Sequence, residues 1–509
     1  MLRLSLRKCV TGGILICFLA GILLGFRFIT RNPEEAYRLA AGIGDKSNKR
    51  GENLDWKFQD ENSFGNHSAS QSKNLMLKKM LDFRAKMQQE RVLKAKMRAN
   101  LTAHNHITPV PFDEDGMNYN VHVFYYVWYG NPSYDGKYFH WNHRLLQNWR
   151  EKIRRKTTRR HFPPLDIASN YYPELGPYSS SNSEVLSIHM QQIKDAKVGC
   201  IAVSWYPPGL ADDEGQPPDR LMPKLFHSAS KFNLKVILHM EPYFGRNHTT
   251  FRRDIIYVMN EYGDHPALYK KYHRGKWLPM FYIYDSYRIS PKHWSEIFHS
   301  NKRYTLRDSK YDAIYIGLAL EESHLLSLKN AGFDGYYTYF ATDGFTHASS
   351  WNFWPEYAQF AKKHNMFFIP SVAPGYIDLQ VRPWNGENKR DRENGKYYEN
   401  SFKAAFNELT EFLTITSFNE WHEGTQIESA IPKTFDTYHY LDYEENGKDF
   451  YLKLTLQYVK KYRRLLHEAK ISAQLAKERK NVVKNNLNKT YQSVMTPVKT
   501  LPKRLHKEP

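Results

Sequence analysis

Two glutamates in the sequence, Glu420 and Glu423, have the residue type and the spacing of a catalytic pair. If the chain turns helically after Asn419, their Cβ atoms lie roughly 5–6 Å apart. This distance is compatible with the roughly 5–5.5 Å between the carboxyl groups of retaining glycosidases. By spacing alone, Glu420 would be a direct nucleophile. Such pairs more often begin a solvated helix, but the adjacent Asn419 and Trp421 and the apolar run before them favour a catalytic site.

Eight apolar, strand-like runs follow residue 120, and helical patterns lie between them. The runs cover 121–129, 200–206, 235–241, 280–285, 313–320, 335–340, 366–372 and 412–415. The helical patterns cover 184–197, 218–232, 250–262, 291–299, 321–330, 351–364, 398–411 and, last, 448–466. Strands that alternate with helices predict a parallel sheet, and eight such units predict a closed (β/α)8 TIM barrel. The alternative is an open doubly wound sheet, but no glycine-rich nucleotide-binding pattern follows any run.

The carboxyl ends of the strands carry the catalytic groups in such a barrel, so we expect the site there. The side chains at these ends are Trp128, Tyr129, Trp205, Tyr206, His239, Glu241, Tyr243, Asp285, Tyr287, Tyr339, Tyr376, Glu420 and Glu423. Arg382 and Trp384 follow the seventh run and extend the set. Taken singly, a tyrosine at a strand end usually caps the core, and Arg382 would form a salt bridge at the barrel lip. Together, acids beside aromatic rings on one face favour sugar recognition.

Composition limits the remaining function classes. The 509 residues can hold one large catalytic domain with appendages. Aromatic residues make up 15%, which suits sugar stacking and an aromatic core equally. The formal net charge of +20 is concentrated at 73–98, at 150–160 and beyond 460. Because no nucleic-acid motif accompanies these charges, we exclude nucleic-acid binding.

The chain has three cysteines, and their positions limit the disulfides and metal sites that it can form. Cys9 and Cys17 lie in the apolar N-terminal run, so only Cys200 remains for the folded part. The folded part can therefore form neither an intramolecular disulfide nor a cysteine-based zinc site. Cys200 opens an apolar run, and we expect it to be a small buried hydrophobic residue.

The N-terminal region predicts a membrane anchor. Basic residues precede the uncharged run 9–26, which is just long enough to span a bilayer. We interpret 1–8 as cytosolic, 9–26 as a type II signal anchor and 27–117 as a lumenal stem with a basic amphipathic helix at 75–100; a cleaved signal peptide is the alternative. Sequons at Asn66, Asn100, Asn247 and Asn488 agree with a lumenal body. The catalytic domain would cover 118–462, and the basic tail 463–509 would be disordered or a frayed helix.

Several ordered motifs resemble one known family, the glycoprotein endo-α-1,2-mannosidases. They are NEWHEGTQIE (419–428), HVFYYVWYGNP (122–132), DGKYFHWNH (135–143), YYPELGPYSS (171–180), SWYPP (204–208), YDSY (284–287), YTYFA (337–341), PGYID (374–378) and RPWN (382–385). The resemblance spans about 118–462, the whole expected barrel. It does not extend clearly to the stem or the tail.

The resemblance implies a retaining hydrolase of the Golgi membrane that cuts inside glucosylated high-mannose N-glycans and releases a glucosylated mannose fragment. It implies neither metal nor cofactor. Glu423 would be the acid/base, and Glu420 would be the base that removes a proton from the sugar's own 2-hydroxyl, which then forms a 1,2-anhydro sugar. The sugar contacts implied are Trp205, Tyr206, Glu241, Tyr284, Asp285, Tyr339, Arg382 and Asn419, and Tyr126, Trp128, His239, Tyr243, Tyr287 and Trp384 complete the candidate set.

Two other classes remain open at this stage. A Golgi glycosyltransferase would generally need an Asp-x-Asp motif, and the one clean match, at 113–115, precedes the first strand. A glycan-binding relative without turnover would keep the barrel and its rim. The presence of both Glu420 and Glu423 argues against such a relative.

Overall fold

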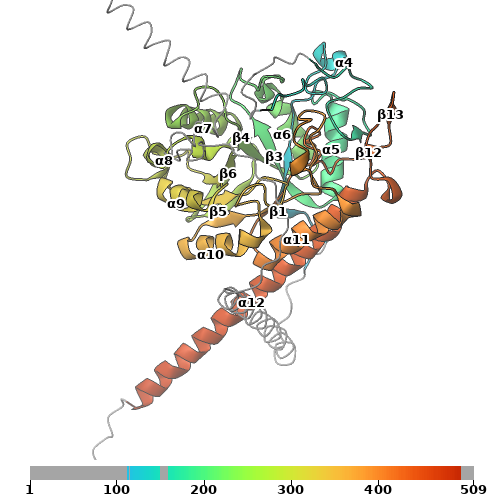
Figure 1. Cartoon of the computed structure of the whole chain (residues 1–509). Coiled ribbons are helices and arrows are strands. Elements are labelled where there is room, and N and C mark those ends of the chain that lie inside the picture. Colours follow the sequence, from blue (N-terminus) through green and yellow to red (C-terminus); the bar gives the residue numbers. More distant parts are fainter. Residues whose placement is uncertain (1–111, 114, 149–158, 495–509) are drawn as a thin grey trace, which may run out of the picture. The chain divides into compact units, whose positions relative to one another are not determined.

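The computed structural model describes residues 112–113, 115–148 and 159–494 (Figure 1). The predicted cytosolic segment, the anchor at 9–26, the stem helix at 75–100 and the sequons at Asn66 and Asn100 lie outside these residues. Within the described part of the chain, no helix is both long enough and apolar enough to cross a membrane.

Parallel strands form a barrel-like sheet, and each of the eight predicted runs contributes to it. The strands are β1 (Asn118–Tyr125), β3 (Val198–Trp205), β4 (Lys235–Met240), β6 (Lys276–Ile283), β7 (Ile314–Leu318), β8 (Gly335–Tyr337), β9 (Phe367–Ile369), β10 (Ser371–Val372) and β11 (Leu413–Ile415). Neighbours in this order pair, except that β9 pairs only with β8 and β10 only with β11, and β11 also pairs with β1. Only Pro370 separates β9 from β10, because proline lacks the N–H that the strand ladder needs. The seventh run therefore joins β8 to β11 and completes the ring.

Helices surround the barrel on its outside (Figure 1). They are α5 (Ser183–Asp195), α6 (Met222–Lys231), α7 (His248–Tyr262), α8 (Pro291–Phe298), α9 (Glu322–Ala331), α10 (Trp354–His364) and α11 (Lys396–Glu408). The last helix, α12 (Phe450–Val494), contacts α5 and β1 and then projects away from the barrel (Figure 1). Asn182, Asn247 and Ser290 begin α5, α7 and α8 with side chains that accept backbone N–H groups. These caps satisfy donors that a helix start would otherwise leave open. The predicted barrel with its surrounding helices is confirmed.

Short elements complete the described chain. They are α4 (Pro132–Asp135), η1 (Pro218–Leu221), η2 (Ser286–Arg288), η3 (Trp351–Phe353), η4 (Gly386–Asn388), η5 (Glu393–Gly395), η6 (Glu444–Asn446), β2 (Tyr172–Pro173), β5 (Lys270–His273), β12 (Ala430–Ile431), β13 (Thr434–Phe435) and β14 (Tyr438–His439). Two helices predicted as single units, at 218–232 and 351–364, begin instead with the separate turns η1 and η3.

The C-terminal helix differs from the prediction. We predicted a closing helix over 448–466, but α12 runs without a break from Phe450 to Val494. The sequence after Leu475 lacks apolar periodicity, but residues 463–494 are rich in alanine, leucine, lysine, glutamine, glutamate and arginine. These residues have high intrinsic helix propensity, which favours continuation of the helix.

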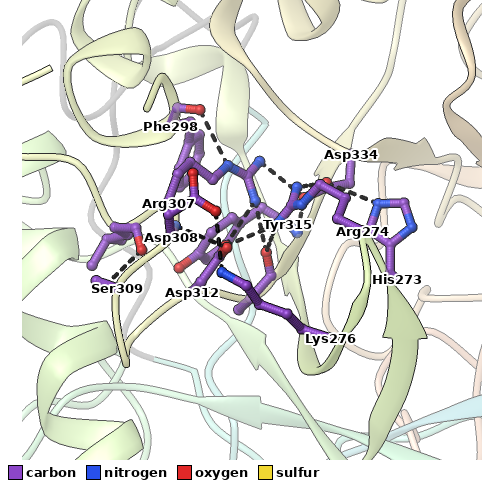
Figure 2. A network of polar contacts seen from close by, with 12 residues as sticks. His273, Arg274, Lys276, Phe298, Arg307, Asp308, Ser309, Asp312, Tyr315 and Asp334 are labelled. Atoms are coloured by element: carbon purple, nitrogen blue, oxygen red, sulfur yellow. Dashed lines mark hydrogen bonds and ion pairs between the residues drawn. The ribbon is translucent and has the colours of Figure 1, made fainter. Parts of the chain in front are cut away.

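A buried ionic network ties together the amino ends of β6, β7 and β8, opposite the expected site (Figure 2). Arg274, in the turn between β5 and β6, donates to Asp312 at 2.8 Å and to Asp334. Arg307 lies 2.9 Å from Asp334 and donates to the carbonyl oxygen of Ala313 at 2.7 Å. Burial alone would raise the pKa of Asp334, but the hydrogen bond from His273 and the two arginines outweigh it and lower the pKa. Groups at this end of a barrel serve stability.

The core is apolar and continuous along the strands. Every residue of β3 is buried, as expected for a parallel strand covered on both faces. Cys200 lies in this strand with no exposed surface and is a free cysteine. The prediction of a small buried hydrophobic role is therefore confirmed.

Candidate active site

A cavity of about 150 Å³ opens at the carboxyl ends of the strands, where the site was predicted. Its walls come from the segments that end or follow β1, β4, β6, β8, β10 and β11, with one histidine from the loop after α4. The lining residues are Tyr126, Trp128, His143, His239, Glu241, Tyr284, Tyr339, Val381, Arg382, Glu420, His422 and Glu423. The structure thus brings both catalytic candidates into one wall, among acids and aromatic rings.

The loop after β11 carries the two glutamates and is held from several sides. The hydroxyl of Ser417 accepts the backbone N–H of Glu420 at 2.8 Å. Trp421, which has no exposed surface, donates its indole N–H to Glu428 at 3.0 Å. The chain makes a turn over 421–424 and not a longer helix. Buried anchors on both sides of the turn therefore fix the positions of the carboxyl groups.

Asn419 connects this loop to the end of β1. Its side-chain oxygen accepts the N–H of Tyr126 at 2.8 Å, and its side-chain nitrogen donates to the carbonyl oxygen of Tyr126 at 2.8 Å. Asn419 has no exposed surface. It was predicted to contact sugar, but in this structure it positions Tyr126.

Glu420 is the more deeply buried member of the pair, with 4% of its surface exposed. Its Oε1 accepts the backbone N–H of His422 at 3.1 Å and lies 3.1 Å from Nδ1 of the same residue. Burial raises the pKa of Glu420, while neighbouring His140 and the backbone N–H of His422 act in the opposite direction.

Glu423 faces the cavity beside a cation. Its Oε1 lies 3.8 Å from Nη1 of Arg382, and its side chain is 23% exposed. Its backbone oxygen accepts the N–H of Ile377 at 2.8 Å. Burial raises the pKa of Glu423, and the neighbouring Glu420 raises it further, whereas Arg382 lowers it. The pKa of each of the two carboxyl groups is therefore raised, and burial is the largest cause for both.

Arg382 combines the two roles considered for it. Its guanidinium pairs with Asp378 at 3.0 Å, which is the salt bridge expected at a barrel lip, and it also faces Glu423. Asp378 accepts further hydrogen bonds from Tyr376 at 2.9 Å and from Asn385 at 3.0 Å. The cation is therefore held in place by a buried carboxylate and not by Glu423 itself.

Tyrosine, histidine and glutamate side chains also line the cavity. His239 lies 2.7 Å from the hydroxyl of Tyr337, and Glu241 accepts the hydroxyl of Ser204 at 2.9 Å. The hydroxyls of Tyr126 and Tyr339 are hydrogen bonded to each other. Tyr339 has a φ of 48°, a left-handed conformation that a bulky residue rarely adopts. Such strain at a strand end is typical of functional sites.

Seven predicted site residues do not line the cavity. Trp205 has no exposed surface and donates its indole N–H to Asp219 at 2.9 Å. Tyr243 is hydrogen bonded to Asp254, Tyr287 stacks on His324, and Trp384 donates to the carbonyl oxygen of Leu146 at 3.0 Å. Tyr206, Asp285 and Asn419 complete this group.

The strand geometry explains the case of Trp205. Side chains alternate between the two faces of a strand, so neighbours in sequence point in opposite directions. Ser204 is in register with His239, and both contact the barrel interior near Glu241. Trp205 therefore points outward, where its ring stacks on that of Tyr257 in α7.

Three lining residues, His143, Val381 and His422, were missed by the sequence reasoning. His422 lies between the two glutamates in sequence, and this position could have identified it. His140, also missed, stacks on Trp128 with ring centroids 4.4 Å apart and lies 3.3 Å from Asp212. Among the described residues, no three histidine, cysteine, aspartate or glutamate side chains gather as a metal site.

Comparison with known proteins identifies similar chains. The family model "Glycosyl hydrolase family 99" matches residues 116–464. Glycoprotein endo-alpha-1,2-mannosidase of Xenopus laevis is 49% identical over 347 residues, which cover 68% of this chain and 77% of that protein. Glycoprotein endo-alpha-1,2-mannosidase-like protein of Homo sapiens is 47% identical over 356 residues, or 70% and 78% of the two chains. The solved structure of the GH99 endo-alpha-mannosidase from Bacteroides thetaiotaomicron is 43% identical, with a TM-score of 0.64, and covers 69% of this chain and 99% of that one.

Proposed function

Because this chain belongs to glycosyl hydrolase family 99 and is a glycoside hydrolase, we propose that it is a retaining endo-α-1,2-mannosidase. Its substrates would be glucosylated high-mannose N-glycans, and its product a glucosylated mannose fragment. The observation that carries this proposal is the joint presence of Glu420 and Glu423 in one cavity at the barrel rim. The names of the relatives, which share 46–49% identity with this chain, support the choice of α-1,2-linked mannose.

The reaction begins with Glu423 protonated. Its raised pKa favours the protonated form, which donates a proton to the oxygen of the departing mannose. Glu420 removes the proton of the 2-hydroxyl of the reacting mannose. The freed oxygen attacks C1 as the bond to the leaving group breaks, and a 1,2-anhydro sugar results. In an α-mannoside the axial 2-hydroxyl lies anti to the leaving group, so its oxygen can attack C1 from the opposite side.

Water completes the cycle. Glu423, now ionised, takes a proton from a water molecule as the water oxygen attacks C1. Glu420 returns its proton to the 2-oxygen as the three-membered ring opens. Two inversions at C1 give overall retention, and both carboxyl groups return to their starting protonation states.

Arg382 and the tyrosine wall orient the sugar in this proposal. Arg382 is held by Asp378 and can stabilise the negative charge that Glu423 acquires when it gives up its proton. Tyr126, Tyr284 and Tyr339 offer hydroxyl groups and ring faces to the sugar. Trp128 is the cavity's tryptophan and supplies a further apolar face.

We also propose that the protein is a single-pass type II protein of the Golgi membrane, anchored by 9–26, with a lumenal catalytic domain. The basic residues before this run and the sequons support the proposal. The Asn247 sequon is exposed at the start of α7, where an oligosaccharide could be attached. Protease protection in sealed Golgi vesicles and a mobility shift on deglycosylation test this topology. Digestion of the barrel in intact vesicles would contradict it.

The test of activity uses the purified full chain with a glucosylated high-mannose N-glycan, beside Glu423→Gln. We expect the unaltered protein to release one glucosyl-mannose fragment, first seen as the α-anomer by proton NMR, and the variant to lose about 10²–10⁴-fold in rate. A second substrate, in which hydrogen replaces the 2-hydroxyl of the reacting mannose, tests the role of Glu420. It should not turn over. Its cleavage through a covalent glycosyl-enzyme would contradict the 1,2-anhydro route, and release of free glucose would contradict endo cleavage.

A further inference from the structure

The histidine between the two glutamates has hydrogen bonds that determine where its protons lie. We propose that His422 and Glu420 share one proton between Nδ1 and Oε1, and that His422 thereby controls when Glu420 can act as a base. The sharing itself follows from the contacts of the two side chains. Only its consequence for catalysis rests on the proposed function.

The first step of the argument concerns Nε2 of His422. This atom lies 3.0 Å from the backbone carbonyl oxygen of His140. A carbonyl oxygen can only accept a hydrogen bond, so Nε2 must carry a hydrogen. In a neutral ring, Nδ1 is then without a hydrogen and can only accept.

The second step concerns Nδ1, which lies 3.1 Å from Oε1 of Glu420. If the ring is neutral, Oε1 must carry the hydrogen of this contact. If Glu420 is a carboxylate, the ring must carry a second hydrogen at Nδ1. With no proton at all, two lone pairs would face each other at hydrogen-bond distance. One proton between the two atoms satisfies the geometry in either position.

The surroundings decide where this proton rests. The rings of His140 and His143 lie 5.3 Å and 5.1 Å from that of His422, measured between centroids. Arg382 disfavours a further positive charge on His422, whereas Asp212 favours one. Burial lowers the pKa of His422 to about 3, and the rings of Trp128 and Tyr129 enclose it further. The resting proton therefore lies on Glu420.

Glu420 must lose this proton before it can serve as the base. Transfer from Oε1 to Nδ1 breaks the O–H bond, forms an N–H bond, and leaves a carboxylate beside an imidazolium. Oε2 can then take the proton of the sugar's 2-hydroxyl. When Glu420 returns that proton at the end of the cycle, the proton on Nδ1 moves back to Oε1. No proton has to be exchanged with solvent.

This internal transfer predicts a particular pH dependence. A buried glutamate without a proton acceptor would have to ionise into solvent, and burial raises the pKa at which it does so. When His422 is present, Glu420 can transfer its proton to Nδ1 of His422 and so become a carboxylate below that pH. Loss of the acceptor should therefore move the acid limb of kcat/KM to higher pH.

Two variants remove the acceptor in different ways. His422→Gln can keep an N–H donor near the carbonyl of His140, and His422→Asn can keep a polar group near Glu420, but neither takes up a proton. For both variants we expect the acid limb of kcat/KM to lie about one pH unit higher than in the unaltered protein. On the acid side, kcat/KM of each variant relative to the unaltered protein should therefore fall by about a further tenfold. His227→Gln, which removes an exposed histidine of α6 outside the cavity, should leave the acid limb where it is. A ratio of variant to unaltered activity that is constant across pH would overturn the proposal.

A second measurement needs no turnover. In the full chain labelled with ¹³C-glutamate and ¹⁵N-histidine, NMR should find the hydrogen on Nε2 of His422, and the Glu420 carboxyl and the His422 ring should titrate in the same steps. A His422 ring that titrates without any response from Glu420 would refute the sharing. If the unaltered protein left the glycan uncut, the proposed function would fail, and the NMR titration would still decide whether the proton is shared.

Discussion

Gly424 follows the acid/base candidate Glu423, and its replacement by alanine should reduce kcat far more than a surface substitution would. Gly424 has a φ of 60°, in the left-handed region. A Cβ at this position would meet Cγ2 of Ile377 at 2.6 Å and the backbone oxygen of Ile377 at 2.7 Å. The backbone oxygen cannot rotate away as a side chain could, so the loop itself must move.

The size of the movement sets the expected effect. Ordinary contact begins at 3.4 Å, so the loop must open by about 0.7–0.8 Å. Ile377 also donates its N–H to the backbone oxygen of Glu423 at 2.8 Å, so the displacement reaches the candidate acid/base. A misplacement of about 1 Å can cost about 10²-fold in rate, and we expect kcat to fall about 30- to 100-fold. The left-handed conformation adds about 1–2 kcal/mol of destabilisation.

Two glycines serve as matched controls. Gly344 has a φ of 80° but nothing within 4 Å of an added Cβ, so Gly344→Ala tests backbone strain alone. Gly386 has neither a left-handed φ nor a close neighbour. For Gly344→Ala, urea unfolding should show a loss of stability, and steady-state kinetics should show an unchanged kcat. Gly386→Ala should change neither the stability nor kcat. If Gly424→Ala loses stability but keeps the kcat of the unaltered protein, the idea that Ile377 holds the acid/base in place is refuted.

Three further outcomes follow from named contacts. Arg307→Met leaves Asp334 short of a buried cation and should destabilise the fold by about 3–5 kcal/mol in urea unfolding. Because the pKa of Asp334 is lowered in the folded state, this difference should be present at neutral pH and shrink as pH falls through that pKa; a pH-independent difference would contradict the assignment. The alkaline limb of kcat/KM should lie well above the ordinary pKa of a glutamate, since Glu423 must be protonated and its pKa is raised, and it should vanish in Glu423→Gln. Arg392→Lys should lower kcat with little change in KM, because Nη2 of Arg392 donates to the carbonyl oxygens of Gly424 and Gln426 at 2.9 and 2.7 Å. An unchanged kcat would show that these hydrogen bonds do not position the loop.

Most of the fold could be predicted from local patterns. Buried parallel strands are continuous apolar runs, and the helices between them have one apolar face, so each element is visible in its own residues. The C-terminal helix is the exception. It runs on to Val494, through residues of high intrinsic helix propensity, and intrinsic propensity is a signal that apolar periodicity does not contain.

The candidate site was predicted only in part, for a geometrical reason. The sequence identifies which residues stand at strand ends, but two adjacent residues at one end face opposite sides of the sheet. Ser204 faces the interior, while Trp205 packs outward against α7. In the same way, Asn419 stands next to the catalytic pair in sequence but contacts only buried groups of the chain.

The sequence by itself determined the type of barrel, the family and the candidate pair of glutamates, because these depend on periodicity and on a run of neighbouring residues. The tertiary structure decided which aromatic rings reach the cavity and which groups surround each carboxyl. His140 and Asp212 are 72 positions apart and lie 3.3 Å from each other. Arg382 and Glu423 are 41 positions apart and lie 3.8 Å from each other. Protonation at the site depends on these long-range contacts and on burial, and neither can be obtained from spacing along the chain.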